Sequence, residues 1–214
     1  MTIRVFIVDD HALVRAGMRM IMSAELDIEV VGEAESGEQA LPMIRKLKPD
    51  VVLCDLHLPG VSGLEVTERL VKGDYECRVI IVSVLEDGPL PKRLLEAGAC
   101  GYVGKGGDAT ELLRAIREAA RGKRYLGSSV AQSLALSGIN GGGSPFDGLT
   151  PRELETALLL VQGMRQQEIA ERLSLSPKTV NTHKSRLFAK LGIHDNIALS
   201  RLLGQHGLLD PAQA

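Results

Sequence analysis

The stretch DVVLCDLHLPG at residues 50–60 decides the fold of this chain. Its apolar part, residues 51–54, is typical of a strand that is buried on both faces of a sheet. Asp55 follows directly, and Pro59-Gly60 then turns the chain away. In open parallel sheets, ligands bind at the carboxyl ends of the strands. An ordinary aspartate after a strand would be the simpler explanation of this stretch alone, so the meaning of Asp55 depends on the rest of the chain.

Apolar runs and amphipathic segments alternate five times over residues 1–122. Besides 51–54, strands are expected at 3–8, 28–32, 78–83 and 100–103, and helices at 11–23, 37–47, 63–71, 89–97 and 109–121. This alternation predicts a doubly wound parallel sheet with helices on both faces, the flavodoxin-like (βα)5 arrangement of an α/β domain. With the strand order 2-1-3-4-5, the first and third strands are neighbours, and the topological switch point lies between them.

Acidic side chains end two of these neighbouring strands. Asp9 and Asp10 end the first strand and Asp55 ends the third, so the topology gathers three carboxylates at one edge. At ~4 Å and an effective dielectric constant near 20, each like-charge pair costs about 4 kcal/mol. The cluster therefore has to take up protons or hold a cation, and hard oxygen ligands with open positions suit Mg²⁺. With the hydroxyl of Ser83 and the amine of Lys105 at further strand ends, the set predicts phosphoryl transfer.

In this order, the five residues resemble the receiver domain of two-component response regulators, over about the first 120 residues. The resemblance implies that Asp55 accepts a phosphoryl group from a sensor histidine kinase. It also implies a Mg²⁺ site, whose protein ligands are Asp9, Asp10, the carboxylate of Asp55 and the backbone carbonyl of His57.

The same resemblance assigns roles to the residues around the acids. Lys105 would neutralise the acyl phosphate, Ser83 would bond a phosphoryl oxygen, and Tyr102 would turn inward as the switch aromatic. The alternative for Tyr102 is an ordinary core position. His11 is expected to start a helix rather than to bind the metal. Gly106 stands where many receivers have proline, which removes no chemistry.

The charge of the chain is divided unevenly between its two parts. Residues 1–122 carry 15 Lys and Arg against 20 Asp and Glu, net −5, whereas residues 123–214 carry 10 against 7, net +3. An acidic front and a basic back indicate two modules with different partners. The three cysteines show no metal-ligand spacing and suit a reducing, cytoplasmic location. No signal peptide and no 18-residue apolar run are found, so no membrane partner is expected.

Residues 123–147 form the predicted linker between a receiver at 1–122 and a second, all-α module at 148–214. A short helix is expected at 128–136. The segment SGINGGGSP at 137–145 has the composition of a flexible tether.

Four helices are expected in the second module, beginning at 150–151 and covering 167–173, 177–191 and 197–203. Thr150 and Glu153 form a capping box for the first of them. Two short helices joined by a turn at 174–176, the second basic and without acids, describe a helix-turn-helix. A solvated basic face would also explain the cations. Their number, the absence of acids and a helix N-terminus that can meet phosphate favour DNA.

The words LTPRE (149–153), EIA (168–170) and SPKTVNTH (176–183) resemble the LuxR-type DNA-binding domain of the NarL/FixJ response regulators. The resemblance implies a four-helix module that binds double-stranded DNA as a homodimer, with the dimer contact on the fourth helix. It implies base contacts from Asn181, Thr182 and Ser185. It implies phosphate contacts from Lys178, Thr179, Lys184, Arg186 and Lys190, with His183 touching the DNA backbone or a neighbouring residue.

Further segments, GPLP (88–91), AQSLAL (131–136), SPF (144–146) and GIH (192–194), resemble the Gac/Uvr-type global regulators of gammaproteobacteria. That resemblance implies activation of genes for small regulatory RNAs. The expected function is a phosphorylation-gated transcription activator that is not an enzyme. The alternatives are a Mg²⁺-dependent phosphatase with Asp55 as nucleophile, and a constitutive DNA-binding protein whose receiver does not signal.

Overall fold

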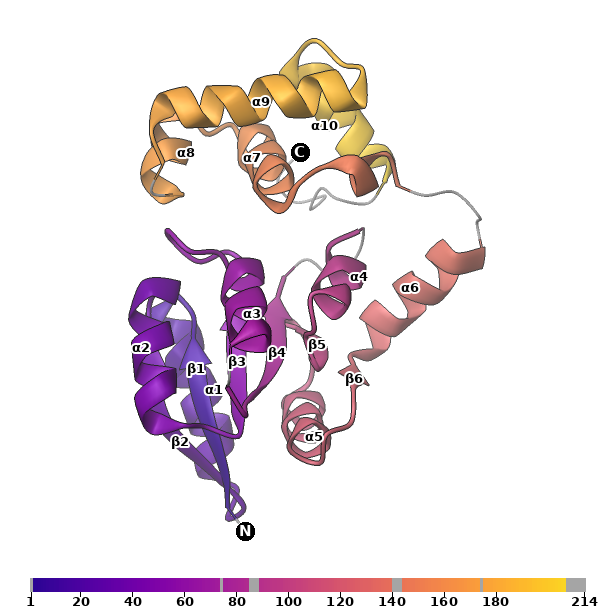
Figure 1. The fold of residues 1–214 in the computed structure, drawn as a ribbon. Helices are drawn as coiled ribbons and strands as arrows, with labels where there is room; N and C mark the ends of the chain where they lie inside the picture. Colours follow the sequence, from indigo (N-terminus) through magenta and orange to yellow (C-terminus); the bar gives the residue numbers. More distant parts are fainter. Residues whose placement is uncertain (1, 74, 85–88, 140–143, 174, 207–214) are drawn as a thin grey trace. The chain divides into compact units, whose positions relative to one another are not determined.

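The computed structural model describes residues 2–73, 75–84, 89–139, 144–173 and 175–206, and the chain forms two compact units (Figure 1). The first unit extends to Ala135, and the second contains the chain from Leu136 onward. Each unit has its own buried apolar core. The limits at 122 and 147, which the sequence suggests for receiver and linker, stay predictions.

Across the described residues, the first unit holds a single six-stranded sheet in the order β2-β1-β3-β4-β5-β6, parallel throughout. The strands are β1 Ile3–Val8, β2 Ile28–Ala34, β3 Val51–Asp55, β4 Arg78–Ser83, β5 Gly101–Gly104 and β6 Tyr125–Leu126. The order confirms the predicted doubly wound topology and places β1 beside β3. Strand β6 was not predicted, because two residues are too short to show a period of two.

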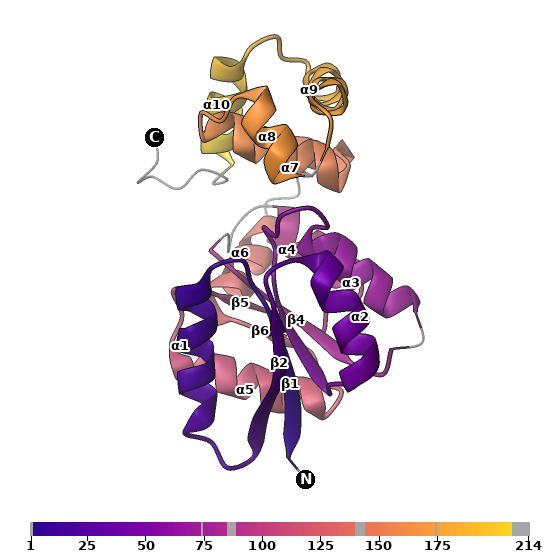
Figure 2. The ribbon, with the colours of Figure 1, turned by 90° about the vertical axis from the view of Figure 1, so that its left-hand side faces the viewer.

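Helices cover both faces of this sheet, with α1 and α5 on one face and α2 and α3 on the other (Figure 2). The helices of this unit up to the sheet's last strand are α1 Ala12–Ser23, α2 Gly37–Leu47, α3 Gly63–Lys72, α4 Pro89–Glu96 and α5 Ala109–Ala120. Every residue of β3 is buried, as expected of a strand covered on both sides. Buried side chains of the sheet, including Val5, Ile7 and Leu53, pack with Met18 of α1 and Ile116 of α5.

Local signals fix where several of these elements begin. The backbone N–H of Gln39 donates to the hydroxyl of Ser36, and that of Thr110 donates to the carboxylate of Asp108, so a side-chain N-cap begins both α2 and α5. Strand β2 continues to Ala34, two residues beyond the predicted end. This extension carries Glu33 and the following Glu35 to the edge of the sheet where β1 ends.

Helix α6, Ser128–Ile139, begins on the first unit. The carboxylate of Glu111 in α5 accepts hydrogen bonds from the N–H of Ser128 at 2.8 Å and from its hydroxyl at 3.1 Å. The N–H of Gly127 donates to the carbonyl of Tyr102 at 2.8 Å, and Val130 is fully buried. Of the predicted tether, residues 137–139 belong to α6 and residues 140–143 lie outside the described residues.

The second unit consists of a short 3-10 helix, η1 Pro145–Gly148, and the helices α7 Pro151–Val161, α8 Gln166–Arg172, α9 Pro177–Leu191 and α10 Asn196–Gln205. Thr150 and Glu153 form the predicted capping box, and Ser176 caps α9. Gly192 ends α9 in the left-handed conformation that favours glycine, at φ +66°. No helix in the described part of the chain has both the length and the apolar character needed to cross a membrane.

Replacing Glu111 with alanine removes the acceptor of the first free N–H of α6. A lost helix cap costs about 1 kcal/mol, so amide hydrogens in the first turn of α6 are expected to exchange about fivefold faster. Hydrogen-exchange mass spectrometry on the full chain measures this. Glu118→Ala is the control, since Glu118 lies on the same helix but pairs with Arg121 and Lys123. Equal exchange in wild type and Glu111→Ala would show that Glu111 does not hold the linker helix.

Candidate functional site

The three predicted acids converge where β1 and β3 end. Val8 pairs with Cys54 across these strands, so the residues that follow, Asp9 and Asp55, emerge side by side. One ligand atom from each of Asp9, Asp10, His11 and Asp55 lies within 4.8 Å of the others. Asp9 is fully buried and Asp55 is 3% exposed, so their charges are only weakly screened by water. The convergence expected from the strand order is therefore present.

Lys105 bridges two of these acids from the end of β5. Its Nζ lies 2.8 Å from Asp9 Oδ2 and 2.9 Å from Asp55 Oδ2. Partial burial acts to lower the pKa of this amine, but the two carboxylates outweigh it and raise the pKa above its usual value. Lys105 is therefore an ammonium at neutral pH. Its backbone N–H donates to the carbonyl of Ser83 at 2.8 Å, which ties the ends of β4 and β5 together.

One ammonium does not balance the acidic cluster. Asp9 Oδ2 and Asp10 Oδ1 are buried oxygens, and the groups in contact with them are the ammonium of Lys105 and the imidazole of His11, respectively. The imidazole Nδ1 of His11 lies 2.7 Å from Asp10 Oδ1. Closely spaced carboxylate oxygens with spare lone pairs form a donor set that fits a hard divalent cation. His11 starts α1 as predicted, and its ring also joins this cluster, which the sequence did not indicate.

The remaining predicted residues of the site lie on the same sheet edge or close to it. Ser83 ends β4 and Tyr102 lies within β5, and both side chains are fully buried. His57 follows β3 in the loop toward α3, where the role of its carbonyl stays a prediction. Gly63, which sequence reasoning did not select, allows α3 to start against Asp55. A Cβ at this position would lie 2.0 Å from the Asp55 carbonyl oxygen.

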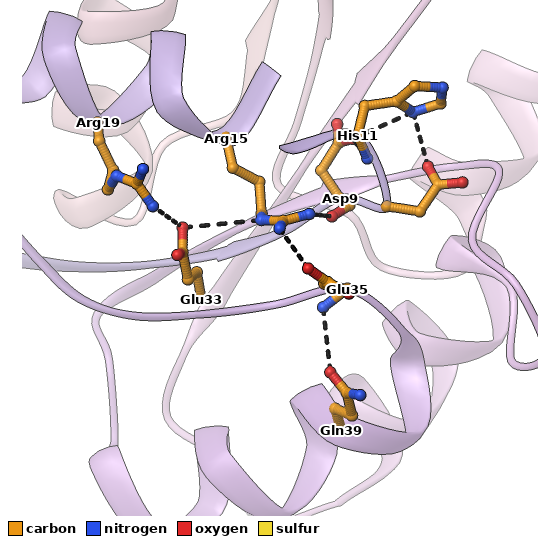
Figure 3. Close-up of polar contacts among 8 residues, drawn as sticks. Asp9, His11, Arg15, Arg19, Glu33, Glu35 and Gln39 are labelled. Atoms are coloured by element: carbon orange, nitrogen blue, oxygen red, sulfur yellow. Dashed lines mark hydrogen bonds and ion pairs between the residues drawn. The ribbon is translucent and has the colours of Figure 1, made fainter. Parts of the chain in front are cut away.

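Arg15 is a second residue that sequence reasoning missed. Its guanidinium is almost buried, at 8% exposure, and reaches the backbone of Asp9 and the carboxylate of Glu35 (Figure 3). A signal was available, because Arg15 occupies the same stripe of α1 as the buried Met18 and Met22. A cation at a core position of an amphipathic helix needs buried partners.

In the second unit, α9 presents a basic surface without acidic residues. Its exposed members from the predicted DNA contacts are Lys178, Asn181, Thr182, Ser185, Arg186 and Lys190. The amide of Gln166, at the start of α8, donates to Asn181 Oδ1 at 3.1 Å. The hydroxyl of Thr182 donates to the Lys178 carbonyl at 3.0 Å, and the hydroxyls of Thr179 and Ser176 lie 2.8 Å apart. Gln166 was not among the predicted contacts, yet it orients one of them.

Lys190 is engaged within its own unit. Its Nζ lies 2.6 Å from Oε2 of Glu153, a carboxylate that is 2% exposed and also caps α7. Burial acts to raise the pKa of Glu153, but hydrogen bonds from Lys190 and Thr150 lower it below the usual value. The ion pair therefore joins the C-terminal part of α9 to the start of α7.

Two further predicted DNA contacts, Lys184 and His183, interact with their own unit. Lys184 Nζ lies 5.2 Å from the centroid of the Phe188 ring, a cation–π distance. The Nδ1 of His183 is buried without a hydrogen bond, and burial lowers the pKa of its imidazole. His183 is thus neutral at pH 7.

Comparisons with known proteins match both units. Residues 5–117 match the response regulator receiver domain, and residues 147–203 match the bacterial regulatory proteins of the luxR family. The response regulator GacA of Pseudomonas viridiflava is 45% identical over 210 residues, covering 97% of this chain and 98% of that protein. The response regulator UvrY of Escherichia coli is 44% identical over 208 residues, covering 96% and 95%.

A solved structure covers both units as well. RcsB of Salmonella enterica serovar Typhimurium, bound to a promoter in the presence of a phosphomimetic, aligns with a TM-score of 0.73. The two chains are 27% identical, and the alignment covers 96% of this chain and all of RcsB.

Asp10→Asn removes one charge from the acidic cluster at nearly constant size. In EDTA we expect the first unit of the variant to unfold at a higher temperature than wild type, because like-charge repulsion falls. Mg²⁺ at about 100 times its dissociation constant should stabilise wild type by about 2.7 kcal/mol, and the variant by much less.

Circular dichroism melting curves with EDTA or Mg²⁺ measure both effects. Glu68→Gln, on the solvent side of α3 in an ion pair with Lys72, is the control and should keep the full response to Mg²⁺. A wild-type melting temperature that does not change when Mg²⁺ is added would contradict a divalent-cation site.

Proposed function

This chain belongs to the response regulators that join a receiver to a LuxR-type output domain, and we propose that a phosphoryl group on Asp55 controls its binding to DNA. The observation that carries the proposal is the bridge from Lys105 to Asp9 and Asp55, at 2.8 and 2.9 Å. The bridge joins a buried acceptor carboxylate, a neighbouring acid and a fixed cation at the switch point of a parallel sheet. These are the groups that in-line transfer to an aspartate needs.

The proposed donor is the phosphohistidine of a sensor histidine kinase. An oxygen of Asp55 attacks phosphorus, the P–N bond breaks, and the imidazole leaves and takes up a proton. Asp9, Asp10, the Asp55 carboxylate and the His57 carbonyl are the groups that would hold Mg²⁺. When bound, this ion supplies charge neutralisation at the phosphoryl oxygens. Lys105 moves its hydrogen bond from a carboxylate to the phosphoryl group, and the hydroxyl of Ser83 donates to another of its oxygens.

The new group changes the charge at the end of the sheet by about −1.5 to −2. Ser83 and Lys105 close on it from β4 and β5, since the backbone already links these two ends. Tyr102 lies in the same strand β5. Its carbonyl accepts a hydrogen bond from the N–H of Gly127, just before α6. A shift of β5 therefore reaches the linker helix directly. We infer that this route, together with the surface of α4 and β5, releases or pairs the output units.

On DNA the proposed active form is a homodimer held through α10. Ile197 on this helix is apolar and 73% exposed, which suits a subunit contact. Helix α9 would enter the major groove, with Asn181, Thr182 and Ser185 toward base edges. In line with the Gac/Uvr resemblance, we propose activation of genes for small regulatory RNAs. Action on DNA places this work in the cytoplasm, and the chain serves as a regulator rather than as an enzyme with turnover.

Acetyl phosphate with Mg²⁺ tests the acceptor. Intact mass spectrometry is expected to find one added phosphoryl group on wild type and none on Asp55→Asn. Asp27→Asn, a carboxylate at the start of β2 that pairs with Arg117, is the matched control and should gain the group normally. Rapid release of phosphate without accumulation on the protein would favour a phosphatase instead. Unchanged labelling of Asp55→Asn would remove Asp55 as the acceptor.

The ion pair of Lys190 separates two kinds of lysine on α9. Lys178→Ala should weaken DNA binding and lower the slope of log affinity against log salt by about 1, because an exposed cation leaves a phosphate. Lys190→Ala should change this slope by much less and should lower the melting temperature, since its amine is held by Glu153. Fluorescence anisotropy with duplex DNA at several salt concentrations measures the slopes. Equal loss of slope in both variants would show that Lys190 leaves Glu153 to bind phosphate.

A further inference from the structure

Arg15 connects the end of β1 to the end of β2 (Figure 3). Its Nη1 donates to the carbonyl oxygen of Asp9 at 2.6 Å, and its Nη2 donates to Glu35 Oε1 at 2.6 Å. The Nε lies 3.7 Å from Glu33 Oε2, which also forms an ion pair with Arg19. A planar guanidinium can reach several acceptors in different directions at once, which a lysine cannot do.

The carbonyl that Arg15 holds belongs to Asp9, whose carboxylate is part of the proposed cation site. The oxygen of Asp9 lies in the peptide plane that also carries the N–H of Asp10, and a peptide plane turns as a unit. A donor on this oxygen therefore fixes the backbone from which the side chains of both acids extend. The other bonds of Asp9 act on different groups. Its N–H donates to Ala34, and its carboxylate accepts the N–H of His11 at 2.8 Å.

The acidic partners of Arg15 are themselves anchored. The N–H of Glu35 donates to Gln39 Oε1 at 3.3 Å, which ties the end of β2 to α2. Glu33 and Glu35 together also offset the charge of the guanidinium. A lone positive charge in this place would repel a cation bound between the acids. Because Glu33 and Glu35 offset its charge, Arg15 can orient the acids with little of this repulsion.

We propose that Arg15 is a positioning residue that sets the affinity of Asp9 and Asp10 for a divalent cation. This inference rests on the proposed function, in which that cation supports transfer to Asp55. Without Arg15, the buried Asp9 carbonyl lacks its donor, and the peptide turns to find another. The two carboxylates then lose their common direction.

An electrostatic role and a positioning role of Arg15 predict opposite changes in Mg²⁺ affinity when its guanidinium is removed. Removal of a positive charge beside acids should by Coulomb's law tighten the binding of Mg²⁺. Removal of a positioning group should weaken it. Arg15→Met keeps most of the buried side-chain volume and therefore separates the two effects by the sign of the change.

The experiment follows phosphorylation of the full chain by acetyl phosphate over a series of Mg²⁺ concentrations. For Arg15→Met we expect the half-saturating concentration of Mg²⁺ to rise about tenfold, with the rate at saturating Mg²⁺ within about twofold of wild type. Arg15→Lys keeps the charge but not the several donors of the planar guanidinium, and it should give an intermediate rise in the half-saturating Mg²⁺ concentration. Arg19→Met removes the exposed neighbour that shares Glu33 and should leave the Mg²⁺ dependence unchanged.

Thermal unfolding of the same variants with Mg²⁺ alone gives a second readout. The stabilisation by Mg²⁺ should shift to higher concentrations in Arg15→Met by the same factor as the phosphorylation. If this variant does not fold, Glu35→Gln decides, because it loosens the guanidinium and should move the Mg²⁺ dependence in the same direction.

A Mg²⁺ dependence that tightens or stays unchanged in Arg15→Met would overturn the proposal, as would a slower saturated rate at unchanged Mg²⁺ affinity. Failure of wild type to gain a phosphoryl group in this assay counts against the proposed function instead. The Mg²⁺ dependence of unfolding still tests Arg15 in that case.

Discussion

The crowding of negative charge at the ends of β1 and β3 is the constraint on which the first unit depends. Three carboxylates share one pocket, and two of them are almost completely buried. Such a cluster is stable only where cations and hydrogen-bond donors face it. Lys105 supplies a cation from β5, His11 supplies a backbone N–H, and Arg15 holds the peptide from behind. Structural stability is thereby exchanged for an acidic site, which we propose to hold a cation and a phosphoryl group.

The compensating residues come from elements that also lead away from the site. Lys105 is bonded through its backbone to Ser83, so the two groups expected to meet the phosphoryl oxygens move as one edge. Three residues before Lys105, the carbonyl of Tyr102 in β5 accepts a hydrogen bond from the N–H of Gly127, which directly precedes the linker helix. Glu111 then caps that helix from α5. The linker thus begins as part of the receiver sheet, which gives a physical path from charge at Asp55 to the chain that carries the output unit.

In the second unit, the basic residues of α9 are not all available to bind phosphate. Helix α9 has no acid of its own, yet Lys190 is bound to the buried Glu153 and Lys184 lies over Phe188. Lys178 and Arg186 remain as exposed positive charges toward solvent. A basic stripe in a sequence therefore contains both residues that hold the helix in its domain and residues that are available to phosphate. Only the partner of each side chain separates them.

The sequence by itself indicated the alternation of strands and helices, the capping box at the start of α7 and, with the order 2-1-3-4-5, the convergence of Asp9, Asp10 and Asp55. These follow from local signals, because periodicity, caps and the ends of parallel strands are read over short stretches. The tertiary structure alone decided the partners of Arg15, Gln166 and Lys190, the need for glycine at position 63, and the strand β6. The contacts depend on residues elsewhere in the chain. Strand β6 has only two residues, which are too few to show a period of two. A sequence specifies such contacts only through the fold that brings them together.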